Sequence, residues 1–163
     1  KRLCETMLAS YQLQYGIDYT VVRMSHTIGA GISLSDGRGF AEFIDTALKG
    51  KDIVLHSDGR VVRTYTYTAD AIGGMLLAFT KGDKQFYNIA NANNELSIYE
   101  LATLIASLVP KPVQVKFDKG VTPSLSYLPY KIGILDSAEL KSLGWEPKVN
   151  ARNSLLWTIE YFL

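Results

Sequence analysis

The sequence predicts an α/β fold, because segments with helical periodicity alternate along it with segments typical of strands. Apolar side chains recur at helical spacing over residues 2–15, and Gly16 follows as a residue type that commonly ends a helix. Residues 19–25 are rich in β-branched side chains and predict a buried strand. A helix that leads directly into such a strand indicates layered α/β architecture.

The rest of the chain continues this alternation. Strand-like composition covers residues 53–56, 62–68, 86–90 and 113–117, and helical stripes cover residues 40–48, 71–79, 98–109 and 151–163. Residues 118–133 form a long segment that contains proline, and long loops of this kind often carry binding function.

Three short motifs predict local structure. The dipeptide Asp58-Gly59 predicts a hairpin between the strands on either side of it. Ser97 and Glu100 have the spacing of a capping box, which marks the start of a helix. The same spacing recurs at residues 136–139 and predicts a second capped helix.

The composition argues against several classes of function. The chain has 163 residues and a formal net charge of +1, and no block of Lys and Arg provides the positive patch typical of nucleic-acid binding. The longest apolar runs, residues 71–79 and 101–109, are shorter than the roughly 20 residues that span a bilayer. Cys4 has no cysteine partner, and with His26 and His56 it offers no metal-ligand spacing. We therefore expect a cytoplasmic protein with no metal site and no nucleic-acid or membrane partner.

A phosphate-binding glycine loop is not evident in the sequence. Residues 29–31 read Gly-Ala-Gly after the predicted strand, but Leu34 stands where the third glycine would be and no helix begins directly after it. We interpret this segment as a turn. A Gly-x-Ser-x-Gly motif is also absent, which argues against a hydrolase with a nucleophilic serine on such a turn.

Arg63 is the most suggestive single residue. It alternates with Tyr65 and Tyr67 along a predicted strand, so all three side chains share one face. A guanidinium suits a diphosphate, and tyrosines can stack on a base or hydrogen-bond a sugar. An exposed strand face with a solvated arginine explains the same spacing, so the residues alone leave both interpretations open. Arg23, inside an apolar strand, is expected to need a carboxylate or carbonyl partner and to have a structural role.

Several short segments carry a family resemblance when they are taken in order. They are Lys1-x-x-x-Glu5, Tyr15-Gly16-Ile17, residues 21–31, Ser57-Asp58-Gly59, Arg63-x-Tyr65-x-Tyr67-x-x-Asp70, Tyr87-Asn88-Ile89, Ser97-Ile98-x-Glu100-Leu101 and Leu143-Gly144-Trp145-x-Pro147. In order and approximate spacing they resemble the C-terminal part of extended short-chain dehydrogenases/reductases, the NAD(P)-dependent nucleotide-sugar epimerases and dehydratases. The resemblance covers essentially the whole chain.

The resemblance implies a division into two domains. Residues 1–34 would supply the last helix and strand of a Rossmann-type dinucleotide-binding domain. Residues 35–163 would form mainly the smaller mixed α/β domain that binds the nucleotide-sugar substrate. Within that part, residues from about 68 to 92 would pack back on the Rossmann sheet.

The resemblance also implies an activity. The full-length protein would be an NAD(P)-dependent nucleoside-diphosphate-sugar epimerase or dehydratase and a homodimer. NAD or NADP would be bound mainly by residues N-terminal to this chain, which is therefore expected to be incomplete and inactive alone. The alternative is a non-catalytic nucleotide-sugar-binding or regulatory module that kept the fold without redox chemistry.

By the same resemblance, five residues have expected roles beside Arg63. Lys1 matches the lysine of the family's Tyr-x-x-x-Lys pair, which is catalytic and also binds the cofactor, and Met24 falls where the backbone approaches the nicotinamide. His26, Tyr65 and Lys131, together with Arg63, are the expected substrate-binding residues. His26 stands where the family has an asparagine, and this departure keeps the non-catalytic alternative open.

Overall fold

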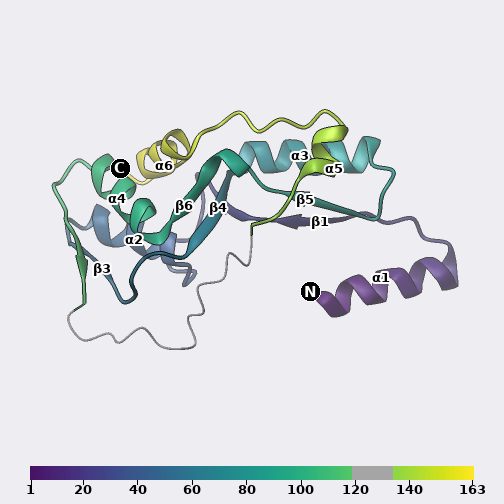
Figure 1. Ribbon diagram of the computed structural model, residues 1–163, viewed down its shortest axis with the longest axis horizontal. Coiled ribbons are helices and arrows are strands. Elements are labelled where there is room, and N and C mark those ends of the chain that lie inside the picture. Colours follow the sequence, from purple (N-terminus) through teal and green to yellow (C-terminus); the bar gives the residue numbers. More distant parts are fainter. Residues whose placement is uncertain (119–133) are drawn as a thin grey trace.

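The computed structural model describes residues 1–118 and 134–163, and it confirms the α/β class (Figure 1). In chain order the elements are α1 (Arg2–Tyr15), β1 (Val21–Met24), β2 (His26–Ile28), α2 (Gly39–Leu48), β3 (Ile53–Leu55), β4 (Val62–Tyr67), α3 (Thr68–Lys81), β5 (Phe86–Ile89), the 3-10 turn η1 (Ala92–Asn94), β6 (Glu95–Ser97), α4 (Ile98–Leu108), β7 (Val115–Phe117), α5 (Ala138–Ser142) and α6 (Ala151–Glu160). Among the described residues, no helix combines the length and apolar composition that crossing a bilayer requires.

The strands in the described part of the chain form three small sheets. β1 pairs with β5 in parallel, β4 lies between parallel β2 and antiparallel β6, and β3 pairs with β7 in parallel. Only Ser25 separates β1 from β2, so the chain passes directly from the first sheet to the second. The two sheets therefore diverge at this residue, and side chains on either side of it lie at the boundary between them.

The hairpin predicted at Asp58-Gly59 is wrong. β3 pairs with β7, whereas both edges of β4 are occupied by β2 and β6. Gly59 does adopt a left-handed conformation, with φ of 70°, and its carbonyl accepts a hydrogen bond from Tyr99 N at 3.0 Å. The turn exists, but it carries the chain from one sheet to another because the pairing partners of both strands come from distant parts of the sequence.

Of the two predicted capping boxes, the first is confirmed and the second is wrong. Ser97 Oγ accepts from Glu100 N at 3.1 Å, and Glu100 Oε2 accepts from Ser97 N at 2.7 Å. Before α5, Asp136 Oδ1 instead accepts from Ala138 N at 2.9 Å, and the residue at the N-cap position is Ser137. A carboxylate that bonds two residues ahead forms a turn, so the helix begins one residue later than the motif predicted.

The larger hydrophobic core lies between the β2–β4–β6 sheet and the helices α2, α4 and α6. Its fully buried side chains include Ile28, Ile44, Leu101, Ile105 and Leu155. A smaller cluster joins α3 and β5 to α5 and the segment after it, and comprises Ala71, Ala78, Tyr87, Ile89, Leu140 and Trp145. The division of the chain into two domains at residue 34 stays a prediction.

Candidate functional site

The centre of the candidate site is a pair of aromatic rings on β2 and β4. The parallel register sets His26 opposite Tyr65, and their ring centroids are 5.6 Å apart. The Tyr65 side chain is buried, with 2% of its surface exposed, and the Phe40 ring from α2 packs edge-on against it at 6.4 Å. The predicted site residues His26 and Tyr65 therefore lie in direct contact.

Arg63 lies two residues before Tyr65 on β4, so strand alternation points both side chains to the same face. It is half-buried, and its Nη1 donates to the Val62 carbonyl at 3.4 Å. Its positive charge contributes to the low pKa of His26, which places the guanidinium within electrostatic range of that imidazole. The structure thus groups three of the predicted substrate-binding residues on one sheet.

Arg38 is a fourth member of this group that the sequence did not predict. It precedes α2, and its guanidinium lies over the Phe40 ring at 4.9 Å from the centroid. It forms an ion pair with Asp36, which holds the pKa of that carboxyl below its usual range. The Asp36-x-Arg38 sequence lies between the predicted strand at residues 19–25 and the predicted helix at residues 40–48 and carries no motif of its own. Its proximity to Tyr65 depends on the tertiary packing of Phe40.

The electrostatics of this group favour an anionic ligand. Desolvation of the ring by neighbouring atoms lowers the pKa of His26, and the positive charges of Arg63 and Arg38 lower it further. Burial raises the pKa of Tyr65 to about 12, so its phenol stays protonated at neutral pH. A neutral imidazole, a phenol and two guanidiniums, of which that of Arg38 is paired with Asp36, supply hydrogen-bond donors and positive charge, and such groups bind a phosphate or diphosphate. We call Arg38, His26, Arg63 and Tyr65 the cationic cluster.

The two residues predicted to act with the cofactor lie on the other side of Ser25. Met24 ends β1 and is 42% exposed, and ligands of open α/β sheets bind at the carboxyl ends of parallel strands. Lys1 is exposed and directly precedes α1, at its N-cap position. Lys131 lies outside the described residues. Among the described residues, no three His, Cys, Asp or Glu side chains are grouped as a metal ion would need.

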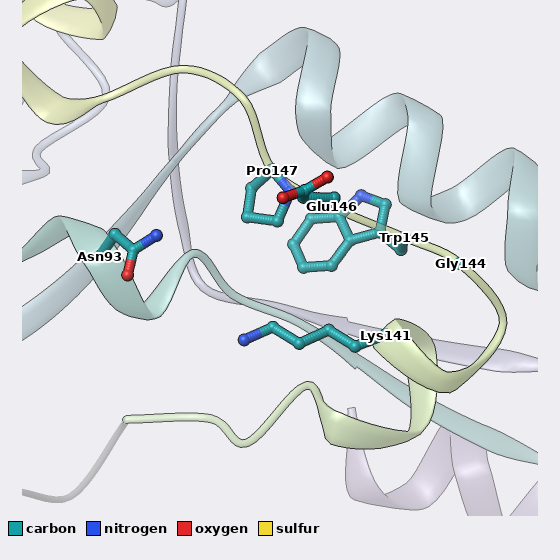
Figure 2. Close-up of a pocket in the computed structure, with 6 residues that line it drawn as sticks. All are labelled: Asn93, Lys141, Gly144, Trp145, Glu146 and Pro147. Carbon is teal, nitrogen blue, oxygen red and sulfur yellow. The ribbon is translucent and has the colours of Figure 1, made fainter.

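A separate surface pocket of about 410 Å³ lies between η1 and the segment that follows α5 (Figure 2). Its lining residues are Asn93, Lys141, Gly144, Trp145, Glu146 and Pro147. None of the predicted site residues that the structure describes contributes to it. The cationic cluster therefore lies outside this pocket, and the positions of its side chains identify it.

Comparison with known proteins gives a family and several relatives. The model of the NAD dependent epimerase/dehydratase family matches residues 1–90. UDP-glucuronic acid decarboxylase 5 of Arabidopsis thaliana is 31% identical over 155 residues, which cover 95% of this chain and 44% of the relative. UDP-glucuronic acid decarboxylase 1 of Danio rerio is 31% identical over 162 residues, which cover 99% of this chain and 38% of the relative.

Solved structures give the same result for the fold. UDP-glucose 4-epimerase of Thermotoga maritima, solved with UDP-glucose, matches with a TM-score of 0.79 and 31% identity, over 99% of this chain and 51% of that one. UDP-glucose 4-epimerase of Thermus thermophilus, in complex with NAD, matches with a TM-score of 0.79 and 23% identity, over 97% and 50% of the two chains. The chain thus spans less than half of these curated relatives and about half of these solved chains.

Proposed function

Because the chain belongs to the NAD dependent epimerase/dehydratase family, we propose that it is the C-terminal, substrate-binding portion of an enzyme that acts on nucleoside diphosphate sugars. The observation that carries this proposal is the cationic cluster, in which His26 contacts the buried Tyr65, Arg63 lies on the same strand, and Arg38 lies over the Phe40 ring that packs against Tyr65. The cluster lies one residue away from the exposed carboxyl end of β1. A substrate held there would present its sugar toward Met24 and its diphosphate toward Arg63.

Each member of the cluster has a proposed part in binding. Arg63 donates in bidentate fashion to the diphosphate, because a guanidinium fork matches phosphate oxygens. His26 donates one ring N–H to the same group, and Tyr65 supplies a neutral phenol that can donate a hydrogen bond without carrying charge. Lys131 remains a proposed substrate contact on the basis of the family resemblance alone. Relatives that act on UDP-glucuronic acid or contain UDP-glucose support a UDP-sugar as the substrate class.

The cofactor proposed for the full-length enzyme is NAD or NADP. The exposed end of β1 fits this proposal, since Met24 is solvent-exposed at the carboxyl end of a parallel strand. When bound, a nicotinamide accepts or returns a hydride. Lys1 would hydrogen-bond the cofactor ribose and, through its positive charge, lower the pKa of a tyrosine four residues before it. The expected homodimer and cytoplasmic location also stay predictions.

Turnover of nucleotide sugars by the full-length protein tests the proposal. Incubation with NAD and either UDP-glucose or UDP-glucuronate, followed by liquid chromatography and mass spectrometry, separates the possible reactions. An epimer has the mass of the substrate but a different retention time, a dehydratase product is lighter by one water, and a decarboxylase product by one carbon dioxide. Absence of both turnover and binding for every nucleoside diphosphate sugar tested would contradict the proposal.

The second candidate is a non-catalytic module that binds nucleotide sugars. The observation that favours it is His26, whose titratable ring stands where the resemblance predicts an asparagine. This candidate predicts UDP binding without turnover. It also predicts that no tyrosine lies four residues before Lys1 in the parent sequence, so both predictions separate it from the enzyme.

A further inference from the structure

The ion pair between Glu5 and Arg23 joins α1 to β1. Arg23 Nε donates to Glu5 Oε1 at 2.9 Å and Nη2 donates to Oε2 at 2.7 Å, so the pair is bidentate. The same guanidinium lies over the Phe86 ring of β5, 4.7 Å from its centroid. Arg23 therefore has the carboxylate partner expected of it, and the hydrogen bond between the two lowers the pKa of the Glu5 carboxyl. The buried strand predicted at residues 19–25 is wrong, because Val21 and Val22 are half-buried and Arg23 and Met24 are exposed.

The helix held by this pair has little else to fix it to the described residues. None of the side chains of α1 is buried, and its apolar residues, such as Leu13 at 89% exposure, contribute to neither hydrophobic cluster. A second polar contact comes from Gln85 Nε2, which donates to Gln12 Oε1 at 2.6 Å. Among the described residues, the side-chain hydrogen bonds that join α1 to the β1–β5 sheet are these two contacts.

The two contacts define how α1 runs along β1. Glu5 reaches Arg23, near the carboxyl end of β1, while Gln12 reaches Gln85, whose carbonyl accepts from Val21 N at the amino end. Helix and strand are therefore antiparallel, and Figure 1 shows the N-terminus of α1 on the side toward which β1 runs. Lys1 precedes Glu5 by about 6 Å along the helix axis, in the direction from Arg23 toward Met24. Lys1 thus lies at the end of α1 that is nearer the carboxyl end of β1.

We infer that Glu5 and Arg23 form a positioning pair, which holds Lys1 beside Met24 where the proposed reaction takes place. The inference rests on the proposed function, and neither residue touches the reacting atoms. A bidentate pair fixes direction as well as distance, because two parallel hydrogen bonds resist rotation of one group against the other. A lysine at position 23 would keep the charge without the fork. The pair therefore serves to orient the helix that carries Lys1.

The test uses Glu5→Gln and Arg23→Lys in the full-length enzyme, each of which breaks the bidentate pair. We expect kcat to fall about tenfold, since Lys1 moves relative to the proton it must influence, while KM for the nucleotide sugar stays within twofold. The acid limb of the kcat profile should move to higher pH, because a more distant ammonium lowers the pKa of the upstream tyrosine less. The double variant should be no slower than either single variant, because the two residues act as one unit.

Glu139→Gln is the matched control, since it removes another exposed ion pair, that with Lys84, in the same half of the molecule. It should leave kcat, the pH profile and KM unchanged, and its melting temperature should equal that of Glu5→Gln. An active enzyme in which Glu5→Gln keeps the wild-type kcat and pH profile overturns the inference and leaves the proposed function standing. A wild-type protein that neither binds nor turns over nucleotide sugars overturns the proposed function itself.

Discussion

Two regions of the molecule, one around β2, β4 and β6 and one around β1 and β5, both combine strands with helices. They differ in how much of the apolar surface of those helices is buried. In the first, α2, α4 and α6 all bury large aliphatic side chains in one continuous core. In the second, α3 buries only Ala71, Gly74 and Ala78 and leaves Phe79 84% exposed, and α1 buries nothing. The first region completes a core of its own, whereas the second presents apolar helix faces outward.

This difference explains why some site residues are held in position by hydrophobic packing and others by polar contacts. Tyr65 is held by neighbours on two sides within the closed region, so the cationic cluster is built on a rigid support. Among the described residues, the helix that carries Lys1 is joined to its neighbours by the Glu5–Arg23 pair and a glutamine pair. We expect the outward apolar faces of α1 and α3 to be covered in the full-length protein, because exposed patches of this kind mark interaction surfaces.

The largest expected effect comes from the core of the closed region. Ile105→Ala should lower the free energy of unfolding by about 2–5 kcal/mol, because it removes a fully buried side chain and leaves a cavity. In this 163-residue chain by itself, Leu13→Ala, on the exposed face of α1, should change it by no more than about 0.5 kcal/mol. Urea denaturation measures both. Equal losses would show that α1 packs as tightly as the closed core and would remove the contrast between the two regions.

The next effect concerns the ligand. Arg63→Ala should weaken binding of UDP by about 2–4 kcal/mol, since it removes a charge-assisted contact to the diphosphate. Arg63→Lys should recover part of this loss, because it restores the charge without the fork. Isothermal titration calorimetry gives both values. Wild-type affinity in Arg63→Ala would mean that this arginine belongs only to the protein surface.

The pH dependence of binding should report His26. Its pKa lies below the usual value because desolvation and the charges of Arg63 and Arg38 disfavour the imidazolium. A bound diphosphate favours the imidazolium, so binding takes up a proton and UDP affinity should rise by up to about tenfold as pH falls from 8 through the pKa of the free protein. His26→Asn should flatten this slope. The stability of the unliganded protein depends on pH with the opposite sign to UDP affinity. The contribution of His26 to stability is present above the ordinary histidine pKa and declines as pH falls through the lowered pKa.

The smallest effect tests a contact that sequence alone predicts. Ser97→Ala should cost about 1 kcal/mol of stability, because it removes half of the capping box at the start of α4. Ser107→Ala is the control near the other end of that helix, since its hydroxyl only donates to the Leu104 carbonyl at an exposed position. Thermal unfolding of the two variants compares them directly. A cost for Ser107→Ala equal to that of Ser97→Ala would show that the cap contributes nothing specific.

The sequence was most informative where structure depends on neighbours along the chain. The helix over residues 2–15 and the capping box at Ser97 are local, and both are confirmed. The hairpin at Asp58-Gly59 failed because the partners of β3 and β4 lie elsewhere in the sequence. The capping box predicted at residues 136–139 is wrong for a different reason, because the Asp136 carboxylate accepts a hydrogen bond within a turn and does not cap the helix.

The candidate site shows the same limit. Alternation along β4 placed Arg63 and Tyr65 on one face, but the burial of Tyr65 depends on Phe40 from α2, which no local pattern predicts. Arg38 was missed because its place beside the cluster follows from the same packing. The roles of Lys1, Met24 and Lys131 came from the family resemblance, and they stay predictions.

The central claim is that the cationic cluster recognises a diphosphate. The most direct test compares the dissociation constants of UDP and UMP for the wild-type full-length protein and for Arg63→Ala, by calorimetry at one pH and ionic strength. The account predicts that the wild type binds UDP at least about tenfold more tightly than UMP, a difference of about 1.4 kcal/mol, and that Arg63→Ala loses most of this preference. A wild type that binds UDP and UMP equally, or a preference that survives in Arg63→Ala, would contradict it.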